Sequence, residues 1–148
     1  MIPSKNCINL IKQFEGLYLK AYRDPVGIPT IGYGSIKWPD GKSVQMGEVI
    51  SIENAELLLN TEVFGIAPII PPLSYNQNQF DAVCSFVYNV GIGSFKRSTM
   101  LRKMRQNVNE WSIRDEFMKW NKGKVNGNLV ELKGLTRRRK AEADLYFS

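Results

Sequence analysis

The stretch FEGLYLKAYRDPVGIPTIGYGS, residues 14–35, lies where one kind of secondary structure gives way to another. Up to its first residue, apolar side chains from Cys7 to Phe14 recur with a helical period, and Ser4 is a suitable N-cap. Gly16 is suited to end that helix. Short alternating runs follow, separated by Asp-Pro and Val-Gly turns, and they predict a small antiparallel sheet.

The predicted sheet lies between Leu17 and Met46 and uses the runs LYLKAY, IPTIGYG and KSVQM. The rest of the chain is mostly helical, with helices predicted at about 52–69, 76–90, 99–106, 110–120 and 137–146. The N-caps predicted for the last three are Ser98, Asn109 and Thr136. The segment NKGKVNGNLVELKG is predicted to be a loop with a short hairpin at Asn126-Gly127. This pattern predicts an α+β fold with a minor sheet.

A chain of 148 residues with 43% hydrophobic content can bury one core, so we expect a single domain over residues 1–148. Within it we expect an N-terminal lobe at about 1–52, a connecting helix at about 52–69 and a C-terminal helical lobe at about 70–148. No apolar run approaches the length of a membrane span, and the first residues lack the features of a signal peptide. We therefore expect a soluble protein.

Composition limits the chemistry. The net charge of +6 should attract a polyanion such as nucleic acid, an anionic membrane face or an acidic cell-wall polymer. The two cysteines, Cys7 and Cys84, form no CxxC motif and fit reduced, buried thiols better than a disulfide framework, although one bridge stays open. The absence of histidine excludes a Ser-His-Asp triad, a Cys-His dyad and a histidine-ligated metal. Acid–base chemistry must then use carboxylates, Lys, Tyr or Cys.

Three residues of the quoted stretch suit such chemistry. Glu15 shares the inward helix face with Ile11, at a helix C-terminus, and both burial and the helix dipole disfavour its charge, which suits a proton donor. Asp24, in a polar turn before a proline, stays ionised and suits a base. If the first two runs pair, Thr30 approaches Asp24 and both can hold one water, as cleavage of a glycosidic bond requires. From spacing alone, a structural role for each residue remains the better explanation.

The order Glu15, eight residues, Asp24, five residues, Thr30 resembles the catalytic signature of the phage-type lysozymes, the endolysins of glycoside hydrolase family 24. The run LKAYRDPVGIPTIGYGS resembles that family's active-site loop and sheet, and LSYNQNQFDAVCSFVYNVG resembles its central helix. The run KGLTRRRKAEADLYF resembles its C-terminal Gly-Leu-x-x-Arg-Arg segment. The resemblance covers nearly the whole chain and implies a lysozyme-like fold with a cleft between two lobes.

The resemblance also implies site residues and a reaction. Glu15 would be the general acid, Asp24 would take a proton from the attacking water, and Thr30 would position that water. The expected reaction is inverting hydrolysis of the β-1,4 bond between N-acetylmuramic acid and N-acetylglucosamine in peptidoglycan, with no cofactor and no metal. One arginine of the RRRK run should pair with Glu15; Arg137 and Arg138 both fit, and Arg137 is preferred.

Substrate contacts are assigned on the same basis, to Tyr88, Asn89, Gly32 and Ile36. Tyr88 and Asn89 match the family's aromatic–amide pair on the cleft wall, and a structural use at the helix end is equally compatible with them. Ser35 departs from the family, which often has histidine there, so a structural ion pair is expected to be missing.

Several alternatives stay open. A lytic transglycosylase would cleave the same bond without needing Asp24, and a catalytically inactive relative would only bind the wall. A nucleic-acid-binding module could use RRRK and FKRSTMLRKMR as a phosphate-contacting face, but no nucleic-acid-binding signature accompanies the charge, so no nucleic-acid partner is expected. For an endolysin we expect a monomer in the host cytoplasm that reaches peptidoglycan after a holin permeabilises the membrane.

Overall fold

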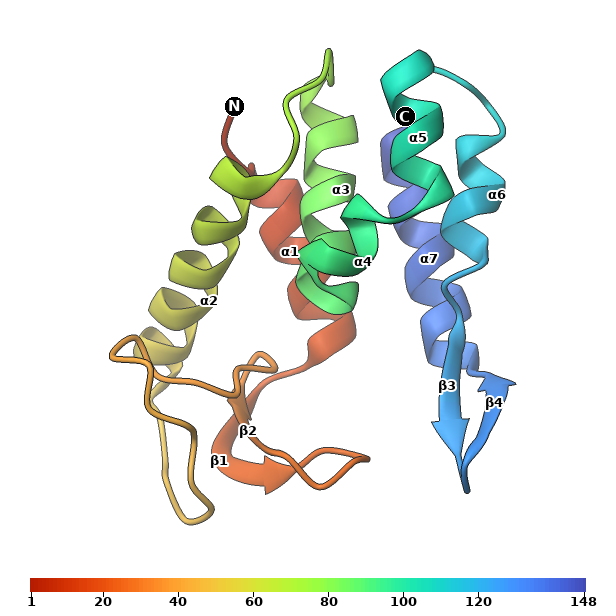
Figure 1. Cartoon of the computed structure of the whole chain (residues 1–148). Coiled ribbons are helices and arrows are strands. Elements are labelled where there is room, and N and C mark those ends of the chain that lie inside the picture. The colour runs from red at the N-terminus through yellow and green to blue at the C-terminus, as the bar shows by residue number, and fades with distance from the viewer.

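The computed structural model describes residues 1–148, in which helices surround one central helix and two small antiparallel sheets lie at one end (Figure 1). The elements are α1 (Lys5–Glu15), β1 (Tyr18–Arg23), β2 (Pro29–Gly32), α2 (Ile52–Ile66), a 3-10 turn (Ala67–Ile69), α3 (Gln77–Val90), α4 (Ile92–Lys96), α5 (Thr99–Gln106), α6 (Ile113–Met118), β3 (Lys122–Val125), β4 (Asn128–Glu131) and α7 (Lys133–Tyr146). The predicted fold class, α+β and mostly helical with a small N-terminal sheet, is confirmed. None of the helices combines the length and hydropathy that a membrane crossing requires.

The central helix is α3, which packs against α1, α2 and α7. It begins with a capping box between Asn76 and Gln79, and every residue from Gln79 to Val87 is buried. The ring of Phe86, near its C-terminal end, lies 5.6 Å from the rings of both Phe117 and Trp120, centroid to centroid. Edge-to-face contacts of this kind stabilise the core beyond simple burial.

The first helix is anchored to α3 at its start and carries Glu15 at its end. The Ser4 backbone N–H donates to the Asp81 carboxylate at 2.8 Å, the Ser4 hydroxyl donates to the same group, and the Gln77 amide adds a third hydrogen bond at 2.9 Å. Asp81 is fully buried, so these donors satisfy a charge that would otherwise be costly. Gly16, with φ +72°, ends α1 as the sequence predicts.

The N-terminal sheet has two strands, with Tyr22 opposite Thr30 and Arg23 opposite Pro29. The prediction that KSVQM forms a third strand is wrong, because this run contributes only an isolated bridge between Lys37 and Ser43. Tight turns with positive φ at Gly41 and Gly47 flank it and leave too little extended chain for a ladder.

The C-terminal predictions are confirmed in part. The hairpin forms at Asn126-Gly127, with φ +51° and +81° as its tight turn requires. The last helix begins at Lys133 and not at Arg137, because the Leu132 carbonyl already accepts the N–H of Thr136 at 3.0 Å.

Helix α6 is shorter than the predicted 110–120 and lacks the Asn109 cap, and the short α4 was not predicted. Cys7 and Cys84 are free and buried, as expected. The division into two lobes and a connecting helix stays a prediction, with α2 and its 3-10 turn filling the range expected for that helix.

Truncation of a core aromatic should destabilise the whole molecule. Phe117→Ala removes a fully buried ring and is expected to lower the free energy of unfolding by about 3–5 kcal/mol. The matched control Leu57→Ala, at a side chain that is 63% exposed, is expected to change it by less than about 0.5 kcal/mol. Urea denaturation of both variants checks this, and equal losses would contradict the placement of the core.

Candidate functional site

Glu15 is the last residue of α1, and its side chain is 21% exposed. Its Oε1 accepts a hydrogen bond from Nη1 of Arg138 at 2.5 Å. On the opposite side the backbone of Gly34 comes so close that a Cβ there would lie 2.7 Å from Glu15 Oε2. Arg138 and Gly34 together fix the position of this carboxylate.

The expectation that Arg137 pairs with Glu15 is wrong, because the pairing residue is Arg138. Successive helical residues point about 100° apart, and Arg138 is the one that faces α3 and is 3% exposed. The side chain of Arg137 is exposed at the rim of the cavity beside Glu15.

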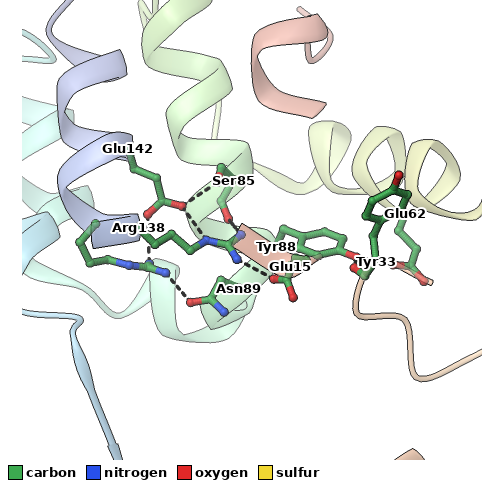
Figure 2. A network of polar contacts seen from close by, with 9 residues as sticks. Glu15, Tyr33, Glu62, Ser85, Tyr88, Asn89, Arg138 and Glu142 are labelled. Carbon is green, nitrogen blue, oxygen red and sulfur yellow. Dashed lines mark hydrogen bonds and ion pairs between the residues drawn. The ribbon is translucent and has the colours of Figure 1, made fainter. Parts of the chain in front are cut away.

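The guanidinium of Arg138 is held by two further groups (Figure 2). Its Nη2 donates to the Ser85 carbonyl at 3.2 Å, and its Nε donates to Glu142 Oε2 at 3.3 Å. Arg139 lies 3.2 Å from Glu142 Oε1 and donates to the side-chain oxygen of Asn89. Burial lowers the pKa of Arg139 to about 10, with Glu142 opposing that change, so Arg139 stays charged at neutral pH.

Asp24 and Thr30 are joined through the backbone of Ile28. Asp24 Oδ1 accepts the N–H groups of Val26 at 2.9 Å and Ile28 at 2.8 Å. The Ile28 carbonyl accepts both the Asp24 N–H at 3.0 Å and the Thr30 hydroxyl at 2.9 Å. The turn after β1 is therefore fixed, and the structure shows no hydrogen bond to Asp24 Oδ2.

Tyr22 lies opposite Thr30 in the sheet and was not singled out from the sequence. Burial raises the pKa of its hydroxyl, and the charges of Tyr18, Glu15 and Asp24 raise it further. The available sequence signal was the alternation of LYLKAY, which places Tyr22 opposite Thr30.

A second carboxylate, Glu62 on α2, lies near Glu15. The Tyr88 hydroxyl donates to the Tyr33 carbonyl at 2.7 Å and lies 3.1 Å from Glu62 Oε2 (Figure 2). Burial raises the pKa of Glu62, and its hydrogen bond with Tyr88 opposes the rise. Glu62 forms no ion pair. Tyr88, expected to contact substrate, thus has its hydroxyl engaged in this internal network.

Two adjoining cavities form a groove along these residues. The cavity beside Glu15, of about 550 Å³, is lined by Gln13, Phe14, Glu15, Asn89, Leu132, Gly134, Leu135, Arg137 and Arg138. Its neighbour, of about 900 Å³, is lined by Val26, Asn89, Val90, Thr99, Glu116, Lys119, Trp120, Lys122, Gly123, Leu129 and Leu135. They share Asn89 and Leu135, so the groove runs from Glu15 between the turn at Val26 and the β3–β4 hairpin. A separate cavity of about 650 Å³ beside Trp38 contains none of the predicted site residues.

The other predicted substrate contacts are not brought to this groove. Gly32 is buried beside Ala55 of α2, and its φ of +65° lies in the left-handed region that favours glycine. Ile36 is 44% exposed and lines neither cavity of the groove. No group of three or more Cys, Asp or Glu side chains gathers as a metal site.

The chain is similar to several known proteins in sequence and in fold. The family model described as phage lysozyme matches residues 12–142. An endolysin of Acyrthosiphon pisum secondary endosymbiont phage 1 is 40% identical over 98% of this chain and 97% of its own. Among solved structures, an endolysin from the Escherichia coli O157:H7 phage FAHEc1 is 40% identical with a TM-score of 0.91, over 99% of this chain and 93% of its own. The muramidase domain of SpmX from Asticaccaulis excentricus is 32% identical with a TM-score of 0.84, over 98% and 97%.

Removing the charge of Glu62 should change how stability depends on pH. The pKa of Glu62 is raised in the folded state. Its contribution to the stability of the fold is therefore complete below the ordinary glutamate pKa of about 4.3, and it is lost as pH rises through the folded pKa. Glu62→Gln has no such loss, so its melting temperature relative to the unmodified protein should increase as pH rises above the ordinary glutamate pKa and become constant above the folded pKa. Calorimetry from about pH 4 to pH 8 checks this, and a difference that stays constant across that whole range would contradict it.

Proposed function

Because the chain belongs to the phage lysozyme family, we propose that it hydrolyses the β-1,4 bond between N-acetylmuramic acid and N-acetylglucosamine with inversion, using Glu15 as acid and Asp24 as base. As a lysozyme-type glycoside hydrolase it acts on peptidoglycan. The observation that carries the assignment of roles is that Glu15 lines the groove, held by Arg138, while Asp24 holds the turn whose Val26 lines the same groove.

Glu15 is suited to protonate the leaving glycosidic oxygen because it borders the groove and is immobilised. Arg138 and the backbone at Gly34 hold its carboxyl from two sides, so little reorganisation is needed when the proton moves. Tyr22, Glu62 and Tyr88 surround it from β1, α2 and α3.

Asp24 and Thr30 are suited to hold the attacking water. Asp24 Oδ2 is free to accept one hydrogen of this water. The Thr30 hydroxyl donates to the Ile28 carbonyl, so its oxygen can accept the second hydrogen of the same water. A water bound in this way presents its own lone pair to the sugar. Such a separate water site favours inversion, where water attacks directly, over a covalent intermediate.

The same water site argues against the lytic transglycosylase alternative, which needs neither Asp24 nor Thr30. The nucleic-acid alternative loses its main support, because two of the four cations of RRRK, Arg138 and Arg139, are buried and cannot contact phosphates. The net charge of +6 is instead suited to approaching an anionic cell wall.

We further propose that the protein is a monomeric endolysin that collects in the host cytoplasm, depends on a holin to cross the inner membrane, and lyses the host. The similarity to phage endolysins supports this route. The two-lobed organisation is part of the same proposal: α2 would join the lobe that carries the water site to the helical lobe that carries Arg138.

Neutral substitutions of Glu15 and Asp24 should remove their catalytic roles while the protein still folds. Glu15→Gln and Asp24→Asn are each expected to lower the rate of peptidoglycan hydrolysis at least about 100-fold, since each removes a proton-transfer group. Turbidity loss of purified peptidoglycan measures the rate, with Lys140→Ala, an exposed change on α7, as the control with normal activity. In the same assay NMR should show the α-anomer first, and mass spectrometry should show hydrated ends. Anhydro ends would establish a transglycosylase instead.

Gly34 provides a test of the position of Glu15. Gly34→Ala forces a Cβ to within 2.7 Å of the carboxylate, whereas Gly41→Ala places one where no atom lies within 4 Å, at nearly the same φ of +86° against +88°. Both should lose about 1–3 kcal/mol of stability from backbone strain. Only Gly34→Ala should lose most of its activity when both are assayed below their melting temperatures, and equal activity would contradict the contact.

A further inference from the structure

Glu142 is a carboxylate with no role in the proposed reaction. It is fully buried on α7 and contacts the two successive arginines Arg138 and Arg139. Its Oε2 also accepts the Ser85 hydroxyl of α3 at 2.6 Å. We infer that Glu142 is a positioning residue, which holds Arg138 on Glu15 and Arg139 on Asn89 and balances their charge. This inference rests on the proposed function.

The helix geometry explains why one carboxylate can hold both arginines. Glu142 follows Arg138 by four residues and Arg139 by three, and both spacings bring side chains together on one helix side. Arg138 then reaches Glu15 on α1, while Arg139 lies 5.0 Å over the Phe86 ring and reaches Asn89, which lines both cavities of the groove. One buried group therefore connects the proton donor with a groove residue (Figure 2).

Charge balance gives Glu142 an influence on Glu15 beyond geometry. Arg138 and Arg139 together carry two positive charges, and Glu15 and Glu142 are the carboxylates that face them. Burial raises the pKa of Glu142, and the arginines and the Ser85 hydroxyl oppose the rise. Without the Glu142 charge, Glu15 alone would balance two buried cations, and its ionised form would be favoured. A general acid must be protonated, so the active pH range would contract from its alkaline side.

The other groups near Glu15 do not change in this comparison. They are Asp24 in the turn after β1, Tyr22 on β1, Glu62 on α2, Tyr88 on α3 and the exposed Arg137 at the rim of the same cavity. None of them contacts Glu142. If substitution of Glu142 shifts the pH profile, the effect therefore reaches Glu15 by way of Arg138 and Arg139.

The test compares Glu142→Gln with Asp81→Asn in the full-length protein. Both remove a fully buried carboxylate charge, but Asp81 binds only Ser4 and Gln77 at the far end of α1 from Glu15. Rates on soluble peptidoglycan fragments, separated into kcat and KM and measured from about pH 4 to pH 9, are combined with melting temperatures. We expect both variants to melt lower, and only Glu142→Gln to move the alkaline limb of kcat/KM down, by roughly 0.5–1 pH unit.

Two further variants test the inference, one that keeps the charge of Glu142 and one that changes its hydrogen-bond partner Ser85. Glu142→Asp, which retains the charge, should keep the limb at its original pH even if its rate falls. If Glu142→Gln does not fold, Ser85→Ala carries the test: it removes the hydroxyl donor to Glu142 and should lower kcat several-fold with little change in KM. An unchanged pH profile in Glu142→Gln, or unchanged kcat in Ser85→Ala, would overturn the inference.

The outcomes separate this inference from the proposed function. If the unmodified protein releases no fragments, or Glu15→Gln retains activity, the proposed function fails before Glu142 is considered. If Glu15→Gln is inactive and Glu142→Gln merely loses activity in proportion to its folded fraction, the proposed function stands and Glu142 is only a structural ion.

Discussion

A buried arginine couples the two ends of the chain at the site. Arg138 meets Glu15 across 123 residues of sequence, and its Nη2 and Nε donate to Ser85 and Glu142. Burying a guanidinium without partners costs several kcal/mol. The positions of α1, α3 and α7 are therefore linked by one set of hydrogen bonds, and a shift of any of these helices would leave a buried charge unsatisfied.

The two sides of the groove position their functional groups by different means. On the helical side, an ion pair and side-chain packing hold Glu15. On the sheet side, backbone groups hold the site. The Ile28 N–H donates to the Asp24 side chain, and the Ile28 carbonyl accepts both the Asp24 N–H and the Thr30 hydroxyl. Backbone donors in a short turn lose little conformational freedom on binding, which suits a site for one ordered water. At Gly34 the backbone comes so close to Glu15 that a Cβ would lie 2.7 Å from its Oε2.

Much of this arrangement follows from local sequence signals. The caps at Ser4, Ser51, Asn76 and Ser98, and the Asn126-Gly127 hairpin, form through contacts within a few residues. The choice between Arg137 and Arg138 could not be made, because the last helix begins four residues earlier than its predicted start at Arg137 and only tertiary packing decides which arginine faces α3. The sequence signal that favoured Arg138 was its spacing of four residues from Glu142, which brings the two side chains together on one side of a helix. Glu62 gave no signal at all, because its nearness to Glu15 depends on how α2 lies beside α3.

The balance of charge differs across the groove in a way that suits glycosidic cleavage. On the helical side, Arg138 and Arg139 balance Glu15 and Glu142 when all are ionised. Asp24, in the turn after β1, and Glu62, on α2, form no ion pair, and burial raises the pKa of Glu62 and reduces its share of charge. The transition state of glycoside hydrolysis resembles an oxocarbenium ion, and a carboxylate without a cationic partner, such as that of Asp24, favours this positive charge. Transfer of the Glu15 proton to the leaving oxygen then creates the helical-side carboxylate that Arg138 already stabilises.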